Sequence, residues 1–100
     1  FNARSLVSKL STLYNLLKSD KYDIICVTET WLTSEIPNSL LLNGSPYYVF
    51  RHDRPTSGGG VAIFVKNIFK CLFINFSTLC DALCVDILFY KIDKIRFVCM

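Results

Sequence analysis

Glu29 is the residue of this chain whose type and position best suit chemistry. It follows the apolar run IICVT at residues 24–28, which is typical of a strand buried on both faces. In α/β architectures ligands and metals are held at the carboxyl ends of strands, and Glu29 would lie at such an end. Magnesium accepts carboxylate oxygens and keeps several waters, so one or two carboxylates suffice. From position alone, a metal ligand and a solvated loop residue both remain open.

Short motifs on both sides of Glu29 follow one another in a specific order. They are NARSL at residues 2–6, ETWL at 29–32, RHDR at 51–54, GGGVAI at 58–63 and DALCVDI at 81–87. This succession resembles the amino-terminal part of an endonuclease/exonuclease/phosphatase domain. Within that superfamily it most resembles the apurinic-like endonuclease of non-LTR (LINE-type) retrotransposons, and the resemblance covers nearly the whole chain.

The resemblance implies an α/β fold, a partial two-sheet α/β sandwich of the DNase I-like type. Residues 1–100 would be the amino-terminal part of one such domain, truncated at both ends. The implied activity is that of a divalent-metal-dependent DNA endonuclease, which uses Mg²⁺ or Mn²⁺ to hydrolyse a phosphodiester and nicks a target site for reverse transcription. The implied partners are DNA and a reverse-transcriptase domain downstream in the same polypeptide, acting in the nucleus.

The resemblance also assigns roles to residues. Glu29 matches the metal-binding glutamate of the family, and Asn2 matches its first active-site residue, whose amide can orient a neighbouring acid or bind the phosphate. Without the resemblance, Asn2 would equally well cap a turn before the helix. Arg51 and Arg54 are predicted DNA-backbone contacts, although a solvated surface explains basic residues at least as well.

Other motifs of the family are expected beyond Met100. They are its tyrosine, a Gly-Asp-x-Asn segment and a terminal Ser-Asp-His segment, which carry the acid/base residues, so the chain alone is expected to be inactive. Two alternatives stay open. One is a non-catalytic remnant of a decayed retroelement, and the other is the same fold acting on a different phosphate ester.

Composition limits these hypotheses only loosely. A chain of 100 residues with 52% hydrophobic content forms one globular unit at most, and a net charge of +3 does not by itself diagnose a nucleic-acid binder.

The five cysteines lie mostly in apolar stretches, which is typical of buried thiols in a reducing compartment. Cys80 and Cys84 lack a second ligand pair and His52 is the only histidine, so no zinc site is expected. No apolar run approaches the roughly 20 residues that cross a bilayer, and the chain is predicted to be intracellular with no membrane partner.

The elements that must position Glu29 follow from periodicity and turn signals. An amphipathic helix over residues 6–17 is predicted, with Ser5 as its N-cap and a preceding strand missing or reduced to Phe1. The glycines at 58–60 are predicted to form a flexible hairpin turn rather than a phosphate-binding loop. Trp31 is expected to pack under the active-site edge, with contact to DNA as the alternative. The remaining predictions are a strand at 24–28, a long loop at 30–46 with a short helical turn, antiparallel strands at 47–50 and 60–66, and a hairpin of 82–90 with residue 95 onward, in two sheets packed face to face.

Overall fold

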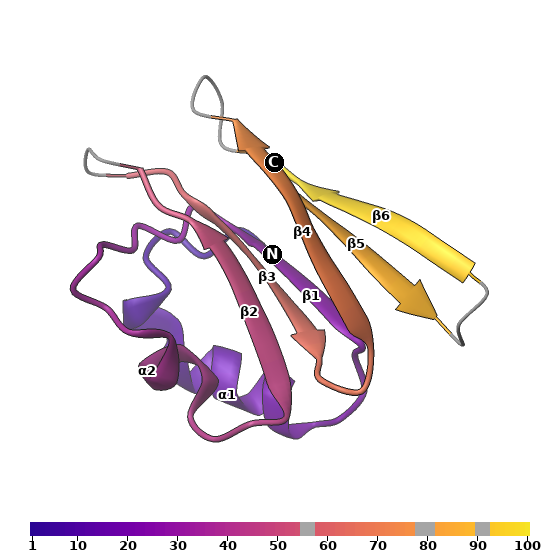
Figure 1. Cartoon of the computed structure of the whole chain (residues 1–100). Helices are drawn as coiled ribbons and strands as arrows, with labels where there is room; N and C mark the ends of the chain where they lie inside the picture. The colour runs from indigo at the N-terminus through magenta and orange to yellow at the C-terminus, as the bar shows by residue number, and fades with distance from the viewer. Residues whose placement is uncertain (55–57, 78–81, 90–92) are drawn as a thin grey trace.

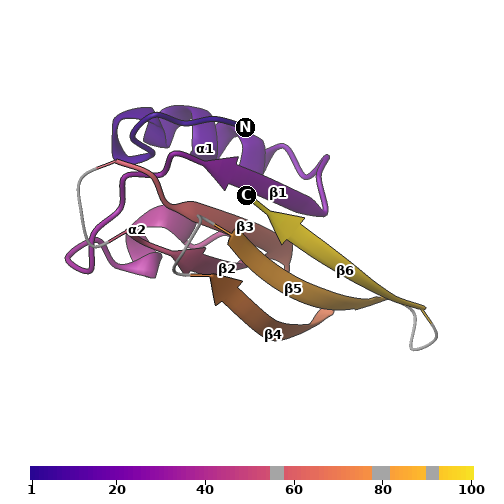
Figure 2. The ribbon, with the colours of Figure 1, turned by 90° about the horizontal axis from the view of Figure 1, so that it is seen from above.

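The computed structural model describes residues 1–54, 58–77, 82–89 and 93–100, which form three layers (Figures 1 and 2). Helices cover one face of a first antiparallel sheet, and a second antiparallel sheet covers the other face. The first sheet has the order β1-β3-β2 and the second the order β4-β5-β6. The elements are a 3₁₀ turn at Val7–Lys9, α1 (Leu10–Lys18), β1 (Ile24–Thr28), α2 (Asn38–Leu42), β2 (Tyr47–His52), β3 (Val61–Lys66), β4 (Lys70–Ser77), β5 (Ala82–Phe89) and β6 (Asp93–Cys99).

The first sheet is buried on both faces, as its apolar sequence predicts. Val27 and Phe64 pack with Leu13 and other residues of the helical layer. Ile63, on the opposite face of β3, packs with Val85 of the second sheet. All five residues of β3 from 61 to 65 are buried, which explains why that strand reads as a continuous apolar run instead of an alternating one. The predicted sandwich of two sheets is therefore confirmed.

The start of the helix differs from the prediction. Ser5 is not its N-cap, because Ser5 adopts φ +85° and its carbonyl accepts a hydrogen bond from the Ser8 hydroxyl. The chain instead enters α1 through the 3₁₀ turn, and no side chain caps either element. The ammonium of Lys9 reaches back to the carbonyls of Ala3 and Arg4 and so fastens the segment before the helix.

The predicted strands are present, with one addition. β1, β2, β3, β5 and β6 lie where they were expected, and α2 is the expected helical turn of the long loop. β4 was not predicted, although it pairs with β5 on both sides of a register shift between Phe73 and Asn75. The reduced strand before the helix is also present, since Asn2 forms a parallel bridge with Thr28 and the Phe1 carbonyl accepts the Thr28 N–H at 2.8 Å.

Cys26, Cys71 and Cys99 are free thiols among the cysteines whose side chains the structure describes. Cys26 and Cys71 are half-buried and Cys99 is buried, where its Sγ lies 3.6 Å from the Val27 carbonyl and 3.8 Å from that of Ala62. These contacts tie the end of β6 to the first sheet. Cys80 lies outside the described residues. Within the described part of the chain, no helix has the length and apolar character needed to cross a membrane.

Candidate active site

The carboxyl ends of β1 and β2 and the start of β3 meet at one edge of the first sheet, at the upper end of that sheet in Figure 1. Thr28 and His52 both pair with Val61, so the residues that follow β1 and β2 emerge beside those that precede β3. The bridge from Asn2 to Thr28 brings the amino-terminal segment to the same edge. The fold thus gathers three of the predicted site residues, Asn2, Glu29 and Arg54, at this edge.

Glu29 is an extra residue in the pairing between β1 and β3. Continued past Thr28 and Val61, the register would place Thr30 opposite Gly59. The Thr30 N–H instead donates to the Gly60 carbonyl at 3.2 Å. The shift of one residue leaves Glu29 as a β-bulge on the β1 side. Glu29 adopts φ +54°, in the left-handed region that residues with a side chain rarely adopt. Such a bulge turns a side chain in a new direction and is common beside active sites.

The glycine segment before β3 holds this bulge in place. Besides the bond from Thr30, the Gly59 carbonyl accepts the Trp31 N–H at 2.8 Å. Gly60 has φ +91°, and a Cβ placed on it would lie 2.5 Å from Oγ1 of the fully buried Thr30. Gly59 and Gly60 therefore accept the backbone hydrogen bonds that hold the Glu29 bulge in place. The prediction of a flexible hairpin turn did not foresee this role.

The Glu29 carboxylate is half-buried and has one neutral partner. Its Oε2 accepts a hydrogen bond from the indole Nε1 of Trp31 at 2.8 Å. Within the described ranges, Oε1 has no hydrogen-bond partner and Glu29 forms no ion pair. Trp31 is 46% exposed, so the expectation that it packs under the edge is wrong. The contact between the two side chains escaped sequence reasoning because it depends on positive φ at both residues.

Asn2 lies beside Glu29 through the backbone. The Ala3 N–H donates to the Thr28 carbonyl at 2.8 Å, and the Ser5 N–H donates to the Glu29 carbonyl at 3.0 Å. The Asn2 side chain is exposed and, in the described part of the chain, makes no hydrogen bond that would cap a turn. Its amide is therefore available at the edge that carries Glu29.

The two predicted DNA-binding arginines differ in their surroundings. Arg54 is exposed at the edge of the site. Arg51 is only 14% exposed and holds Asp53 through two bonds of 3.1 and 2.7 Å. Its guanidinium also donates to the Ile36 carbonyl at 2.7 Å, the Asn38 Oδ1 at 3.0 Å and the Thr33 carbonyl at 2.9 Å. Arg51 thus fastens the loop before α2 to β2, and its contact with DNA stays a prediction.

The donor set at this edge suits a hard divalent cation better than zinc. Glu29 supplies carboxylate oxygen and Asn2 supplies amide oxygen, which are the ligand types of Mg²⁺ and Mn²⁺. No group of three His, Cys, Asp or Glu side chains that could hold a metal occurs among the residues the structure describes. A site built on Glu29 would therefore depend on water for most of its ligands, as magnesium sites commonly do.

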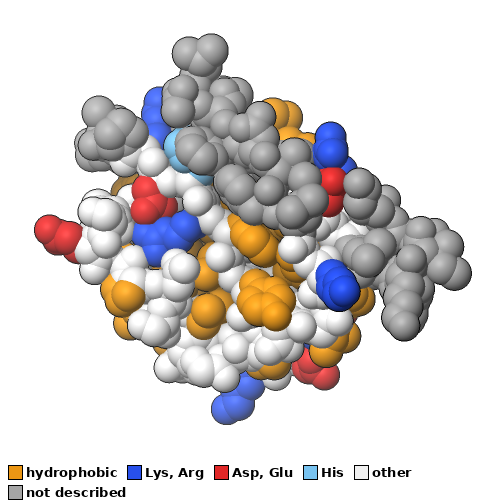
Figure 3. All heavy atoms as spheres, in the orientation of Figure 1, with side chains coloured by type: hydrophobic (Ala, Val, Ile, Leu, Met, Phe, Trp, Pro, Cys, Tyr) orange, Lys and Arg blue, Asp and Glu red, His pale blue; other side chains and the backbone are white. Residues whose placement is uncertain are grey.

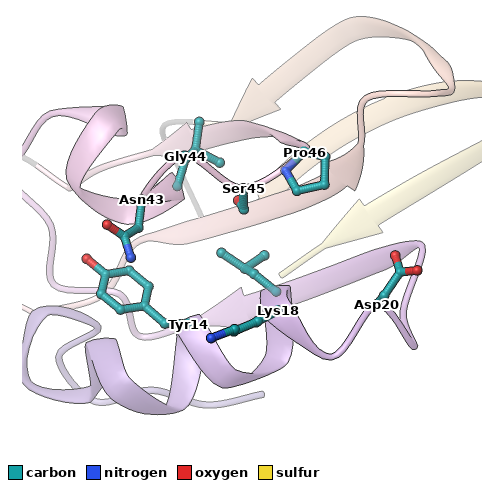
Figure 4. A pocket seen from close by; sticks show the side chains of 9 residues that line it. Tyr14, Lys18, Asp20, Asn43, Gly44, Ser45 and Pro46 are labelled. Carbon is teal, nitrogen blue, oxygen red and sulfur yellow. The ribbon is translucent and has the colours of Figure 1, made fainter.

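The larger cavities among the described residues lie away from Glu29. One, of about 600 Å³, lies between Tyr14 and Lys18 of α1 and the loop with Asn43 and Ser45 (Figure 4). The other, of about 640 Å³, is lined by residues of β2 such as Tyr48 and by the turn before β4, on a face where hydrophobic side chains gather (Figure 3). Neither includes Glu29 or Asn2.

Residues 1–99 match the family model described as Endonuclease/Exonuclease/phosphatase family. No curated protein matches the chain.

Proposed function

Because the chain belongs to the endonuclease/exonuclease/phosphatase family, whose members are generally hydrolases of phosphodiester and phosphate-ester bonds, we propose that it forms part of a divalent-metal-dependent DNA endonuclease. The proposed reaction is nicking of a target site to prime reverse transcription of a retroelement. The order of the NARSL, ETWL, RHDR and GGGVAI motifs supports this finer assignment.

The observation that carries the proposal is the state of the Glu29 carboxylate. It lies on a bulge at the end of β1, held by a neutral donor and without a cation within the described ranges. Among the described carboxylates, Asp20, Asp23, Asp53 and Asp86 lie beside basic side chains instead. A half-buried carboxylate that has no basic partner is suited to binding a divalent cation. Mg²⁺ or Mn²⁺ there would polarise a phosphoryl oxygen and stabilise the leaving alkoxide.

Other residues at the edge would serve the substrate. The Asn2 amide can donate to a phosphate oxygen or orient the Glu29 carboxylate, because the parallel bridge keeps its backbone beside Thr28. Arg54 is exposed next to the same edge and can contact a DNA phosphate, which supplies affinity without sequence preference. In this proposal, this part of the fold positions the DNA phosphate through Asn2 and Arg54 and binds the cation through Glu29.

The test compares two glutamates in the intact protein. Glu29→Gln keeps the shape of the side chain and removes the charge that would hold the cation. Metal ions contribute several kcal/mol to such reactions, and each 1.36 kcal/mol is about tenfold in rate, so nicking of supercoiled plasmid should fall by about 100-fold or more. Glu35→Gln, an exposed position in the loop before α2, is the matched control and should nick like the parent.

Substrate specificity is tested in the same preparations. The nicked product should be extended by a DNA polymerase, because the proposed cut leaves a 3′-hydroxyl. Hydrolysis of a small phosphate ester with no nicking of DNA would replace the endonuclease assignment by the broader family activity. A Glu29→Gln variant as active as the parent at limiting magnesium would remove Glu29 from the mechanism.

A further inference from the structure

Trp31 is the only tryptophan in the chain, and its one polar atom is directed at Glu29. The indole Nε1 donates to Oε2 of the carboxylate at 2.8 Å, although 46% of the side chain is exposed. An exposed tryptophan gains little from burial, so its position here follows from this bond and from the backbone that carries it.

The backbone on both sides fixes the indole. The Trp31 N–H donates to the Gly59 carbonyl at 2.8 Å, and Trp31 adopts φ +53°. Its neighbours Thr30 and Leu32 are buried, with exposures of 0% and 2%, and anchor the segment in the core. A Cβ on Gly58 would lie 3.9 Å from Nε1, so the glycine segment passes close beside the ring nitrogen. The buried neighbours Thr30 and Leu32 and the bond to Gly59 thus hold Trp31 beside Glu29.

We propose that Trp31 is a positioning residue, which fixes the orientation of the Glu29 carboxylate so that Oε1 is presented to a divalent cation. This inference rests on the proposed metal-dependent function. A hydrogen bond to an ionised oxygen is stronger than one between neutral groups and restricts the side chain to one orientation. Because the indole is neutral, it does this without cancelling the charge, unlike a lysine or arginine in the same place.

Removing the indole N–H should weaken cation binding without unfolding the protein. Trp31→Phe keeps an aromatic ring and loses the donor. Trp31→Gln restores a donor, because its amide nitrogen is the same number of bonds from Cβ as the indole nitrogen. Partners that orient a metal ligand typically change affinity by about 10–100-fold. We expect Mn²⁺ to bind about 10–100-fold more weakly to Trp31→Phe than to the parent, and Trp31→Gln to regain most of the loss.

The measurement is a Mn²⁺ titration of the intact protein in which free Mn²⁺ is followed by its EPR signal. Tyr48→Phe is the control, since Tyr48 has a similar exposure of 48% and lies on β2 instead of beside Glu29. Thermal unfolding midpoints of all variants should match that of the parent. In a nicking assay, Trp31→Phe should need more magnesium for half-maximal activity while its rate at saturating magnesium recovers.

The outcomes separate this inference from the function on which it rests. Equal Mn²⁺ affinity of Trp31→Phe and the parent would overturn the positioning role and leave the metal site intact. Equally weak binding by the Phe and Gln variants would overturn the role of the N–H group. A parent that binds no more Mn²⁺ than Glu29→Gln would remove the metal site itself, and the positioning role with it.

Discussion

The two ends of β1 both carry carboxylates, but only one end neutralises them. At the amino end, Lys66 of β3 lies 2.7 Å from Asp20 and 3.6 Å from Asp23, and Asp20 raises the pKa of Lys66 through this contact. At the carboxyl end, Glu29 has the neutral indole of Trp31 as its partner and, within the described residues, no cation. At the amino end, ion pairs join β3 to the segment before β1. At the carboxyl end, the Glu29 carboxylate is left without a basic partner among the described residues.

The backbones of the two ends also differ, although Asp20 at the amino end has φ +60°. The amino end of the sheet is closed by ordinary hydrogen bonds, such as that from the Tyr47 hydroxyl to the Tyr22 carbonyl at 2.5 Å. The carboxyl end collects residues with positive φ, among them Glu29, Trp31 and Gly60. Strained backbone persists only where surrounding structure holds it, and it is concentrated at functional sites. Acidic side chains thus form ion pairs at one end of β1, whereas at the other end we propose that one of them binds a cation.

Gly60→Ala should disrupt the carboxyl end most strongly. An added Cβ would meet Thr30 Oγ1 at 2.5 Å, and φ +91° is strained for any residue with a side chain. Overpacking typically costs 1–3 kcal/mol and positive φ about 1–2 kcal/mol, so we expect a loss of about 2–4 kcal/mol in the free energy of unfolding, measured by urea denaturation. Mn²⁺ binding should weaken as well. Gly44→Ala is the control, because no atom lies within 4 Å of its Cβ position despite a φ of +73°. A similar loss in both variants would assign the effect to φ alone.

Arg51→Ala should lower the stability of the fold through the loss of its contacts within the chain. The substitution leaves Asp53 and the carbonyls of Thr33 and Ile36 without their donor. Hydrogen bonds of charged groups contribute about 1.5–3 kcal/mol each, and we expect a total loss of about 2–3 kcal/mol because water replaces some of them. Thermal denaturation measures this loss. An unchanged melting temperature together with weaker DNA binding would return Arg51 to the DNA-binding surface.

Tyr47→Phe should change how the stability of the amino end of the sheet depends on pH. Burial raises the pKa of Tyr47 above its ordinary value of 10.0, so the folded chain holds the phenolic proton more tightly than the unfolded chain. The resulting stability is fully present below about pH 10 and is lost as the pH rises through the folded pKa. The free energy of unfolding, measured between pH 8 and pH 11.5, should fall more steeply in the parent than in Tyr47→Phe. Below pH 10 the variant should be less stable by about 1 kcal/mol, the value of one hydrogen bond. Parallel curves would contradict the assignment.

Arg54→Ala should have the smallest effect, and we expect it mainly in DNA binding. Each phosphate contact contributes about −0.9 to the slope of log affinity against log salt, so loss of one contact should make that slope shallower by about this amount. Fluorescence anisotropy at several salt concentrations measures it. Glu29-dependent nicking at saturating DNA should be unchanged. An identical slope would mean that Arg54 does not contact the backbone.

Strands buried on both faces were the most predictable part of this fold. β1 and β3 are apolar throughout because helices cover one face and the second sheet covers the other. β4, also an apolar run, was missed, since a short apolar segment does not show by periodicity whether it is strand, helix or loop. Its assignment as a strand depends on pairing with β5, which is a tertiary contact. The Ser5 cap failed for a similar reason, because the bond of the Ser5 backbone to Glu29 and its positive φ set the chain path there.

The sequence indicated candidate site residues, whose roles stay predictions, but not the geometry around them. The position of Glu29 after an apolar strand, together with the motif order, indicated the carboxylate and the neighbouring Asn2. The bulge, the indole contact and the role of Gly60 depend on a one-residue register shift between segments far apart in sequence. No local pattern encodes such a shift. The contacts of Arg51 within the chain were also beyond local sequence patterns, and its contact with DNA stays a prediction.

The strand order β1-β3-β2 also has a consequence for how the site assembles. β2 and β3 follow each other along the chain, as do the three strands of the second sheet, so these pairs form between neighbours. β1 reaches β3 only after the chain from residue 29 to 60 has folded back, and closing such a loop costs conformational entropy before any contact repays it. The Glu29 edge should therefore be completed late in folding and open early in unfolding. In hydrogen exchange, the amides of Thr30 and Trp31 would lose protection before those within the β2–β3 hairpin.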